Sequence, residues 1–138
     1  MNSALPVSAL VTLVGDLPSA THAAGSKKSS GIDMSEFEAA MFTAAVGTVA
    51  DTGTIQLEQA TTSNFSDAKA LREVVDLATD TPVQIGLKSD ELDVNNGFRY
   101  VRANLTGTGG SVMAGISVFG LNARYSPAAA KTGAIIVD

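Results

Sequence analysis

Apolar and polar residues alternate along much of this chain, and the alternation predicts β-strands. In the segment 54–59, Ile55 and Leu57 fall on one face and polar side chains fall on the other. A period of two residues is that of a strand with one buried face. Similar patterns predict further strands at residues 36–46, 83–87, 98–106 and 111–124.

Short glycine-containing connections join two pairs of these strands. Residues 47–53 follow the strand at 36–46, and Gly107–Gly110 join the last two predicted strands. Short connections between neighbouring strands are typical of hairpins, so we expect a hairpin at each place. Asn96-Gly97 marks a further tight turn, because both residues tolerate a positive φ.

The segment 68–78 fits two interpretations. The spacing of one helix face is followed by Leu71, Val74, Val75 and Ala78, yet the same stretch also alternates as a strand does. A short helix and a strand both stay open there. A parallel α/β fold needs repeated helices, and this is the one candidate. The predicted fold class is therefore all-β, an antiparallel β-sandwich of jelly-roll-like or immunoglobulin-like type.

The first residues differ from the rest of the chain in composition. Residues 1–31 are rich in Ser, Ala and Pro and include the Gly/Ser/Lys-containing run 23–31. Such a composition buries little apolar surface. We expect an N-terminal arm at 1–31, with one short strand at 9–14, then a β-sandwich domain at 32–127 and a C-terminal tail at 128–138.

The amino-acid composition excludes several kinds of catalytic and metal-binding site. Among 138 residues there is no cysteine, no tryptophan and one histidine. Disulfide scaffolds, thiolate zinc sites and cysteine nucleophiles are excluded, as are sites that need two histidines. No Ser-His-Asp set, carboxylate pair or nucleotide-binding loop stands out in the sequence. We therefore predict that the protein is not an enzyme and that it uses no cofactor or metal.

Charge and hydropathy argue against two kinds of partner. The formal net charge is −5, whereas nucleic-acid binding needs a basic face. No run of about 18 apolar residues occurs, so we expect no transmembrane helix and no membrane partner. No basic residue precedes the mildly apolar stretch around Leu10, so we also expect no secretory signal.

Four residues are candidates for contact with a partner. Lys27 and Lys28 are adjacent in the predicted arm and would attract an acidic surface, although solvation of a linker is the simpler explanation. Arg102 lies in a predicted strand beside Tyr100, and contact with another protein stays open for it. Tyr125 follows the last predicted strand and is the fourth candidate.

Nearby polar features have simpler explanations. For Arg99 we favour pairing with a carboxylate of the same chain. His22 is expected in a flexible polar loop, where a single histidine is usually solvated. The acidic cluster at residues 90–96 lacks the spacing of a helix-loop-helix calcium site. Gly107–Gly110 lacks the Gly-Lys-Ser/Thr ending of a phosphate-binding loop, and a turn explains it.

Three stretches of the chain resemble one known family. The first, residues 36–46, is an early sheet segment. The second, residues 53–67, is a strand followed by a polar loop with an aromatic residue and Ser-Asp. The third begins with the Arg-Tyr-Val-Arg strand at 98–103 and continues through a glycine-rich turn and an apolar strand to residues 122–125. In this arrangement the chain resembles the small β-sandwich proteins of tailed-bacteriophage heads, the head-decoration or capsid cement type.

This resemblance implies a structural virion protein. Such a protein is made in the host cytoplasm, sits on the outer face of the capsid and contacts the major capsid protein. It is often a homotrimer and reinforces the contacts between capsid subunits against internal pressure.

Two other functions stay open at the level of sequence. One is a tail or head–tail joining subunit of the same kind of particle. The other is a carbohydrate-binding module on a β-sandwich. Sugar platforms usually present exposed Trp or Tyr rings, and this chain has no Trp and two Tyr, which disfavours the second alternative.

Overall fold

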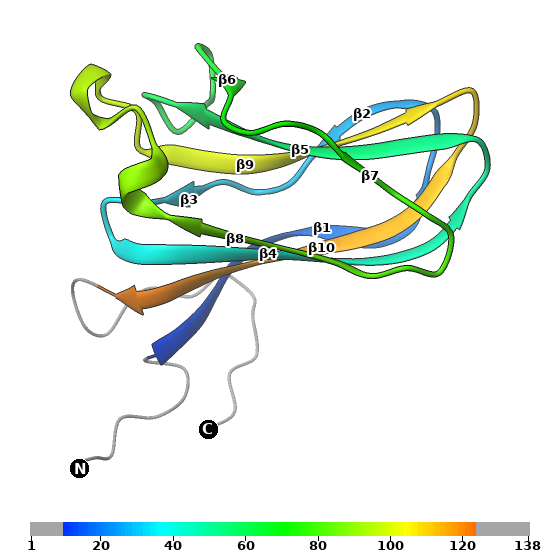
Figure 1. The fold of residues 1–138 in the computed structure, drawn as a ribbon, viewed down its shortest axis with the longest axis horizontal. Helices are drawn as coiled ribbons and strands as arrows, with labels where there is room; N and C mark the ends of the chain where they lie inside the picture. Colours follow the sequence, from blue (N-terminus) through cyan, green and yellow to red (C-terminus); the bar gives the residue numbers. More distant parts are fainter. Residues whose placement is uncertain (1–9, 124–138) are drawn as a thin grey trace.

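Two antiparallel β-sheets, packed face to face, make up the structure, a computed structural model that describes residues 10–123 (Figure 1). The first sheet has the strand order β1 (Val11–His22), β10 (Val112–Ala123), β4 (Phe37–Val49) and β8 (Val83–Lys88). The second contains β2 (Gly25–Lys28), β3 (Ile32–Asp33), β9 (Tyr100–Thr108), β5 (Thr52–Ala60), β6 (Lys69–Ala70) and β7 (Val75–Asp76). Two short 3₁₀ helices, η1 (Ser89–Glu91) and η2 (Val94–Asn96), connect β8 to β9. The predicted all-β sandwich is confirmed.

Two strands of the second sheet are interrupted rather than separate. β2 and β3 both pair with β9, and between them the Ser29 amide donates to the Ala103 carbonyl at 2.9 Å. β6 and β7 both pair with β5, and between them the Leu71 amide donates to the Leu57 carbonyl at 2.9 Å. Each pair therefore acts as one strand, and the sandwich has four strands in each sheet.

The order of these strands is that of a jelly roll. β1-β10-β4-β8 forms one sheet, and the second runs from β2 and β3 through β9 and β5 to β6 and β7. Except for the step from β5 to β6, each change of strand crosses from one sheet to the other. Two four-stranded sheets joined by such crossings are the double Greek key of jelly rolls. The structure thereby decides between the jelly-roll-like and immunoglobulin-like alternatives.

Both predicted hairpins are wrong for this reason. β4 and β5 lie in different sheets, and so do β9 and β10. Their two connections meet at one end of the sandwich, where the Ala50 amide donates to the Ser111 carbonyl at 3.0 Å. A strand shows the same alternation whether its neighbour in the chain pairs with it or faces it across the core. The alternation therefore reported the buried face correctly and left the pairing partner undetermined.

The core consists mainly of aliphatic side chains between the two sheets. Ile55 and Leu57 point inward as predicted and are 2% and 1% exposed. The largest fully buried side chains are Phe37, Phe42, Ile32, Ile55, Leu57, Leu105, Ile116, Val101, Val112 and Val118. Phe37 lies against Gly120, where an added Cβ would come within 2.5 Å of its ring. The small residue at position 120 thus makes room for one of the few aromatic rings in the core.

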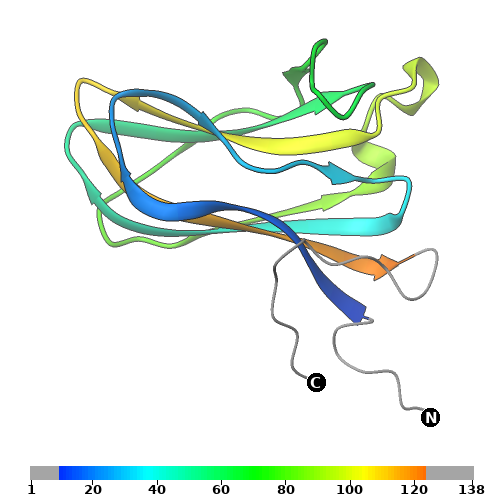
Figure 2. The same cartoon turned by 180° about the vertical axis from the view of Figure 1, so that it is seen from behind.

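Residues 11–28 are part of the sandwich rather than of an N-terminal arm. β1 pairs with β10 from Val11, opposite Leu121, to His22, opposite Val112 (Figure 2). The register shifts between Leu17 and Ala20, around Pro18. Proline has no amide to donate, so it is tolerated at an irregularity of an edge strand. The predicted short strand at 9–14 covers only the beginning of β1, and the Pro- and Ser-rich composition concealed the rest of it from the sequence prediction.

The helix alternative for residues 68–78 is also wrong. This segment follows the edge of β5, and the Leu77 amide donates to the Gly53 carbonyl at 2.8 Å. The Gln56 side-chain amide donates to the Arg72 carbonyl at 2.8 Å. Hydrogen bonds to a neighbouring strand outweigh the weak helical pattern, because local propensity is a small energy beside tertiary pairing. Within residues 10–123, no helix is long and apolar enough to cross a membrane.

Candidate functional site

A cluster of charged and aromatic side chains occupies the outer face of the second sheet. At its centre Glu58 of β5 accepts hydrogen bonds from Lys28 of β2 and Arg102 of β9, with Nζ–Oε1 and Nε–Oε1 distances of 3.0 and 2.8 Å. Strand register explains this arrangement, since Glu58 lies directly opposite Arg102 and Lys28 opposite the next outward residue of β9, Asn104. Two of the predicted contact residues, Lys28 and Arg102, therefore meet at one carboxylate.

Aromatic rings extend the cluster along β9. The Arg102 guanidinium lies over the Phe65 ring, with Cζ 4.3 Å from the ring centroid. Phe65 meets Tyr100 edge to face, with centroids 6.4 Å apart and an interplanar angle of 66°. Arg99 lies over Tyr100 at 4.9 Å and forms a double hydrogen bond with Asp33. The interpretation of Arg99 as an intramolecular partner of a carboxylate is confirmed. We call Lys28, Glu58, Phe65, Tyr100 and Arg102 the cation–aromatic cluster.

Phe65 is a member of this cluster that sequence reasoning did not single out. It has a φ of 57°, unusual for a bulky residue, and its side chain is buried. The loop is closed by Asp67, which accepts from the Thr61 amide at 3.0 Å. Gly31 lies under the ring, where an added Cβ would be 2.6 Å from Cε1. The one available signal was an isolated aromatic residue inside a polar loop.

Two carboxylates of this surface titrate below their ordinary range. Burial alone would raise the pKa of Glu58, but hydrogen bonds from Arg102 and Lys28 outweigh it and lower the pKa. The pKa of Asp33 is lowered in the same way. Burial alone would raise this pKa, but the hydrogen bonds from Arg99 and Ser35 outweigh that effect. Both groups stay ionised at neutral pH and hold their cations in place.

Acid is therefore expected to destabilise the protein. A carboxylate whose folded pKa is lowered stabilises the fold above its unfolded pKa, and that contribution is lost as the pH falls through the folded value. We expect a constant melting temperature from pH 7 to about pH 5 and a steep decline below about pH 4, where the ordinary values of Asp and Glu lie. Thermal denaturation at a series of pH values across this range measures the melting temperature. The variant Glu58→Gln should show a shallower decline, and an identical pH profile in that variant would contradict this assignment.

The remaining predicted positions lie apart from the cluster. Lys27 is exposed on the edge strand β2, opposite Leu105. Tyr125 and the predicted tail at 128–138 lie outside the described residues. His22 belongs to β1, where its Nε2 lies 3.1 Å from the Ala114 carbonyl oxygen, so it is not in a loop as the sequence interpretation assumed.

The acidic cluster at residues 90–96 is held against the second sheet by hydrogen bonds and ion pairs. Asp93 accepts a hydrogen bond from Lys69 at 2.7 Å, and Lys69 also lies over the Phe98 ring. The Asp93 amide donates to the buried Gln59 side chain at 2.9 Å, and Arg72 pairs with Glu91. Among residues 10–123, no group of three or more His, Cys, Asp or Glu side chains is placed to hold a metal ion.

Two cavities adjoin the Asp33–Arg99 ion pair. One, of about 250 Å³, is more polar and is lined by Val14, Gly31, Ile32, Asp33, Glu36, Phe37, Ser63, Phe65 and Tyr100. The other, of about 370 Å³, is mainly apolar and is lined by Met34, Ser35, Ser89, Asp90, Leu92, Val94, Phe98 and Arg99. Asp33 of the first cavity and Arg99 of the second are paired with each other.

Comparison with known proteins gives distant structural similarities. No protein-family model and no curated protein matches the chain. A chain of a Bacillus endospore appendage, from a family of disulfide-linked pili, is similar at a TM-score of 0.49 with 15% identity, covering 88% of this chain and 98% of that one. A chain of Broad Bean Stain Virus is similar at a TM-score of 0.43 with 8% identity, covering 94% and 100%. Similarities this distant assign no function to the chain.

Proposed function

We propose that this protein is a structural component of a virion that binds the outer face of a capsid and stabilises contacts between major capsid subunits. The observation that carries the proposal is the contrast between the two outer faces of the jelly roll. On the second sheet Lys28, Glu58 and Arg102 are paired with one another. On the first sheet the outward positions of β4 and β10, from 39 to 47 and from 113 to 121, carry no charged residue. Jelly rolls serve in viral capsids as well as in lectins and cupins, and a fold alone does not assign a function. Such surfaces suit a protein that works by contact.

Of the predicted contact residues, Lys27 is the best placed to meet an acidic partner. It is exposed on an edge strand, whereas Lys28 and Arg102 share the carboxylate of Glu58. A charge on an edge strand also discourages unwanted pairing of that edge with other chains. We propose that Lys27 contributes to capsid binding by long-range attraction.

The capsid proposal predicts binding to shells that lack this protein. Purified protein should co-sediment with such shells and should raise the temperature at which they come apart. Protein that neither co-sediments nor stabilises the shells would overturn the proposal. Antibody labelling of intact particles separates this function from the alternative of a tail or head–tail subunit.

Reversal of the charge at Lys27 should weaken that binding. We expect Lys27→Glu to lower the affinity about tenfold at low salt, which corresponds to about 1.4 kcal/mol, with a smaller effect at high salt because surface charges are screened. Lys88→Glu is the matched control, since Lys88 is also exposed but lies on the edge strand β8 of the other sheet. Equal losses in the two variants would show that only net charge matters.

A carbohydrate-binding function is the second candidate, and the more polar cavity favours it. Carboxylates and an aromatic ring, as supplied there by Asp33, Glu36 and Tyr100, are groups that hydrogen-bond and stack on sugars. A glycan-binding screen tests this candidate. Binding that is lost in Tyr100→Ala would support it, and a negative screen would remove it.

A further inference from the structure

The outer face of the first sheet carries two neighbouring rows of apolar side chains. In one row Val11 of β1, Leu121 of β10 and Ala39 of β4 lie opposite one another. In the next row the members are Leu13, Phe119 and Met41. We call these six residues the apolar face.

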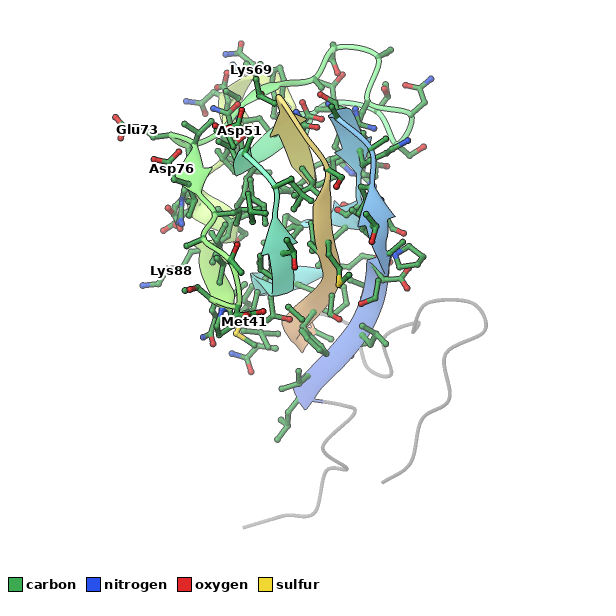
Figure 3. All side chains as sticks on the ribbon, turned by 90° about the vertical axis from the view of Figure 1, so that its right-hand side faces the viewer. Met41, Asp51, Lys69, Glu73, Asp76 and Lys88 are labelled. Atoms are coloured by element: carbon green, nitrogen blue, oxygen red, sulfur yellow. The ribbon has the colours of Figure 1, made fainter. Side chains whose placement is uncertain are left out.

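These side chains point away from the core. The residues that alternate with them, such as Ala40, Phe42 and Val118, are 1%, 2% and 0% exposed and fill the interior. Met41 and Phe119 are half-buried, and Val11 is 37% exposed. Figure 3 shows Met41 on the side of the molecule opposite to Lys69, which belongs to the second sheet.

The apolar face has no counterpart on the second sheet. There the outward positions hold Lys28, Glu58 and Arg102, which are paired with one another. On β10 and β4, by contrast, the outward positions from Met113 to Leu121 and from Ala39 to Gly47 carry no charged residue. On the flanking strands of this sheet, Asp16 of β1 lies opposite Ser117 and Lys88 of β8 lies opposite Ala39. Charged residues of this face therefore lie at the border of the apolar rows.

The size of the first sheet matches that of a contact between subunits. β1, β10, β4 and β8 contain 12, 12, 13 and 6 residues. At about 3.3 Å per residue and about 4.8 Å between strands, they present a face of roughly 700 Å². A standard interface removes about 800 Å² from each partner and combines an apolar centre with a polar rim. Next to the apolar rows lies a polar row that includes Ser117 and Thr43.

Small residues also keep this face open to close approach. Gly86 of β8 lies opposite Met41, it is exposed, and a Cβ added to it would meet no atom within 4 Å. A flat sheet face without large polar side chains allows another sheet to pack at about 10 Å. Because a copy of this chain carries a net charge of −5, the uncharged outward positions of the central strands β4 and β10 are a place where two copies can approach with little repulsion.

We propose that the apolar face is covered by a second copy of this chain. The contact removes the two apolar rows from water, and burial of apolar area is the main driving force of association. This inference concerns self-association and does not depend on capsid binding.

The variant Gly86→Lys tests the proposal without disturbing the fold. The lysine would stand in open space beside Met41 and place a charge in the contact. Thr108→Lys is the matched control, because Thr108 is exposed on β9 of the second sheet. Sedimentation velocity over a range of concentrations measures the mass of each variant, and circular dichroism verifies the fold.

The natural chain should sediment with at least twice the 14.0 kDa mass of one chain. Gly86→Lys should raise the midpoint concentration of association at least tenfold, and Thr108→Lys should leave it unchanged. A natural chain that is monomeric at all concentrations would overturn the proposal, as would equal association of Gly86→Lys and the natural chain. If Gly86→Lys associated normally but no longer bound capsid shells, the partner on this face would be the capsid, so this inference would fail while the proposed function stood.

Discussion

Replacing Phe37 with alanine is expected to lower the free energy of unfolding by about 3–5 kcal/mol, the usual cost of removing a buried phenylalanine ring. Phe37 is 1% exposed and packs against Gly120. Strands β4 and β10 are paired at this point, since Ala40 lies opposite Gly120. The backbone cannot collapse into the vacated volume without breaking that pairing, so a cavity would remain. For a domain whose total stability is typically about 5–15 kcal/mol, this is a large fraction.

Urea denaturation of Phe37→Ala and of the natural protein measures this loss. Val94→Ala is the control, because Val94 is 62% exposed on η2 and its truncation removes little buried area. We expect that control to change the free energy by less than about 0.5 kcal/mol. A loss below about 1 kcal/mol for Phe37→Ala would mean that the ring is not enclosed as described.

Replacing Glu58 with alanine is expected to lower the free energy of unfolding by about 1.5–3 kcal/mol, the range for hydrogen bonds that involve charged groups. The Glu58 side chain is 16% exposed and that of Arg102 is 20% exposed. Without the carboxylate, Arg102 remains partly desolvated above Phe65 with no partner there. Lys28, whose side chain is 37% exposed, can turn to water and contributes less.

Two comparisons separate this effect from a general loss of charge. Glu73→Ala removes an exposed carboxylate between β6 and β7, and we expect a change within about 0.5 kcal/mol. In a double-mutant cycle, Glu58 should couple more strongly to Arg102 than to Lys28. Equal coupling to both cations, or none to Arg102, would contradict the assignment of Arg102 as the main partner.

The two outer faces differ in their side chains, so substitutions on each face are expected to change a different measured property. Variants in the cation–aromatic cluster should act mainly on stability and its pH dependence, because their charges are satisfied within the chain. Variants on the apolar face should act on association while stability per chain changes little. This separation allows the charge pairing of the cluster and the self-association of the apolar face to be tested independently.

The candidate site was predicted in part. Arg102 and Lys28 were singled out by their residue type, but the sequence placed them in a strand and a mobile arm. Glu58 brings them together because β2 and β5 both flank β9, and pairing across 30 residues of separation leaves no local pattern. Phe65 joins the cluster through a left-handed backbone conformation, which its side chain does not favour and which the folded loop imposes.

The sequence by itself determined the all-β class and which side of most strands faces the core. Ile55, Leu57, Val101, Ala103 and Leu105 are buried as their alternation predicted, because apolar side chains leave water whatever the strand order. The order itself was decided only by the tertiary structure. Short connections at residues 50–51 and 109–111 turn the chain across the core instead of back along the same sheet, so two expected hairpins became crossings. Alternation encodes burial, a property of each residue, whereas pairing depends on the hydrogen bonds and packing available once all the strands have met.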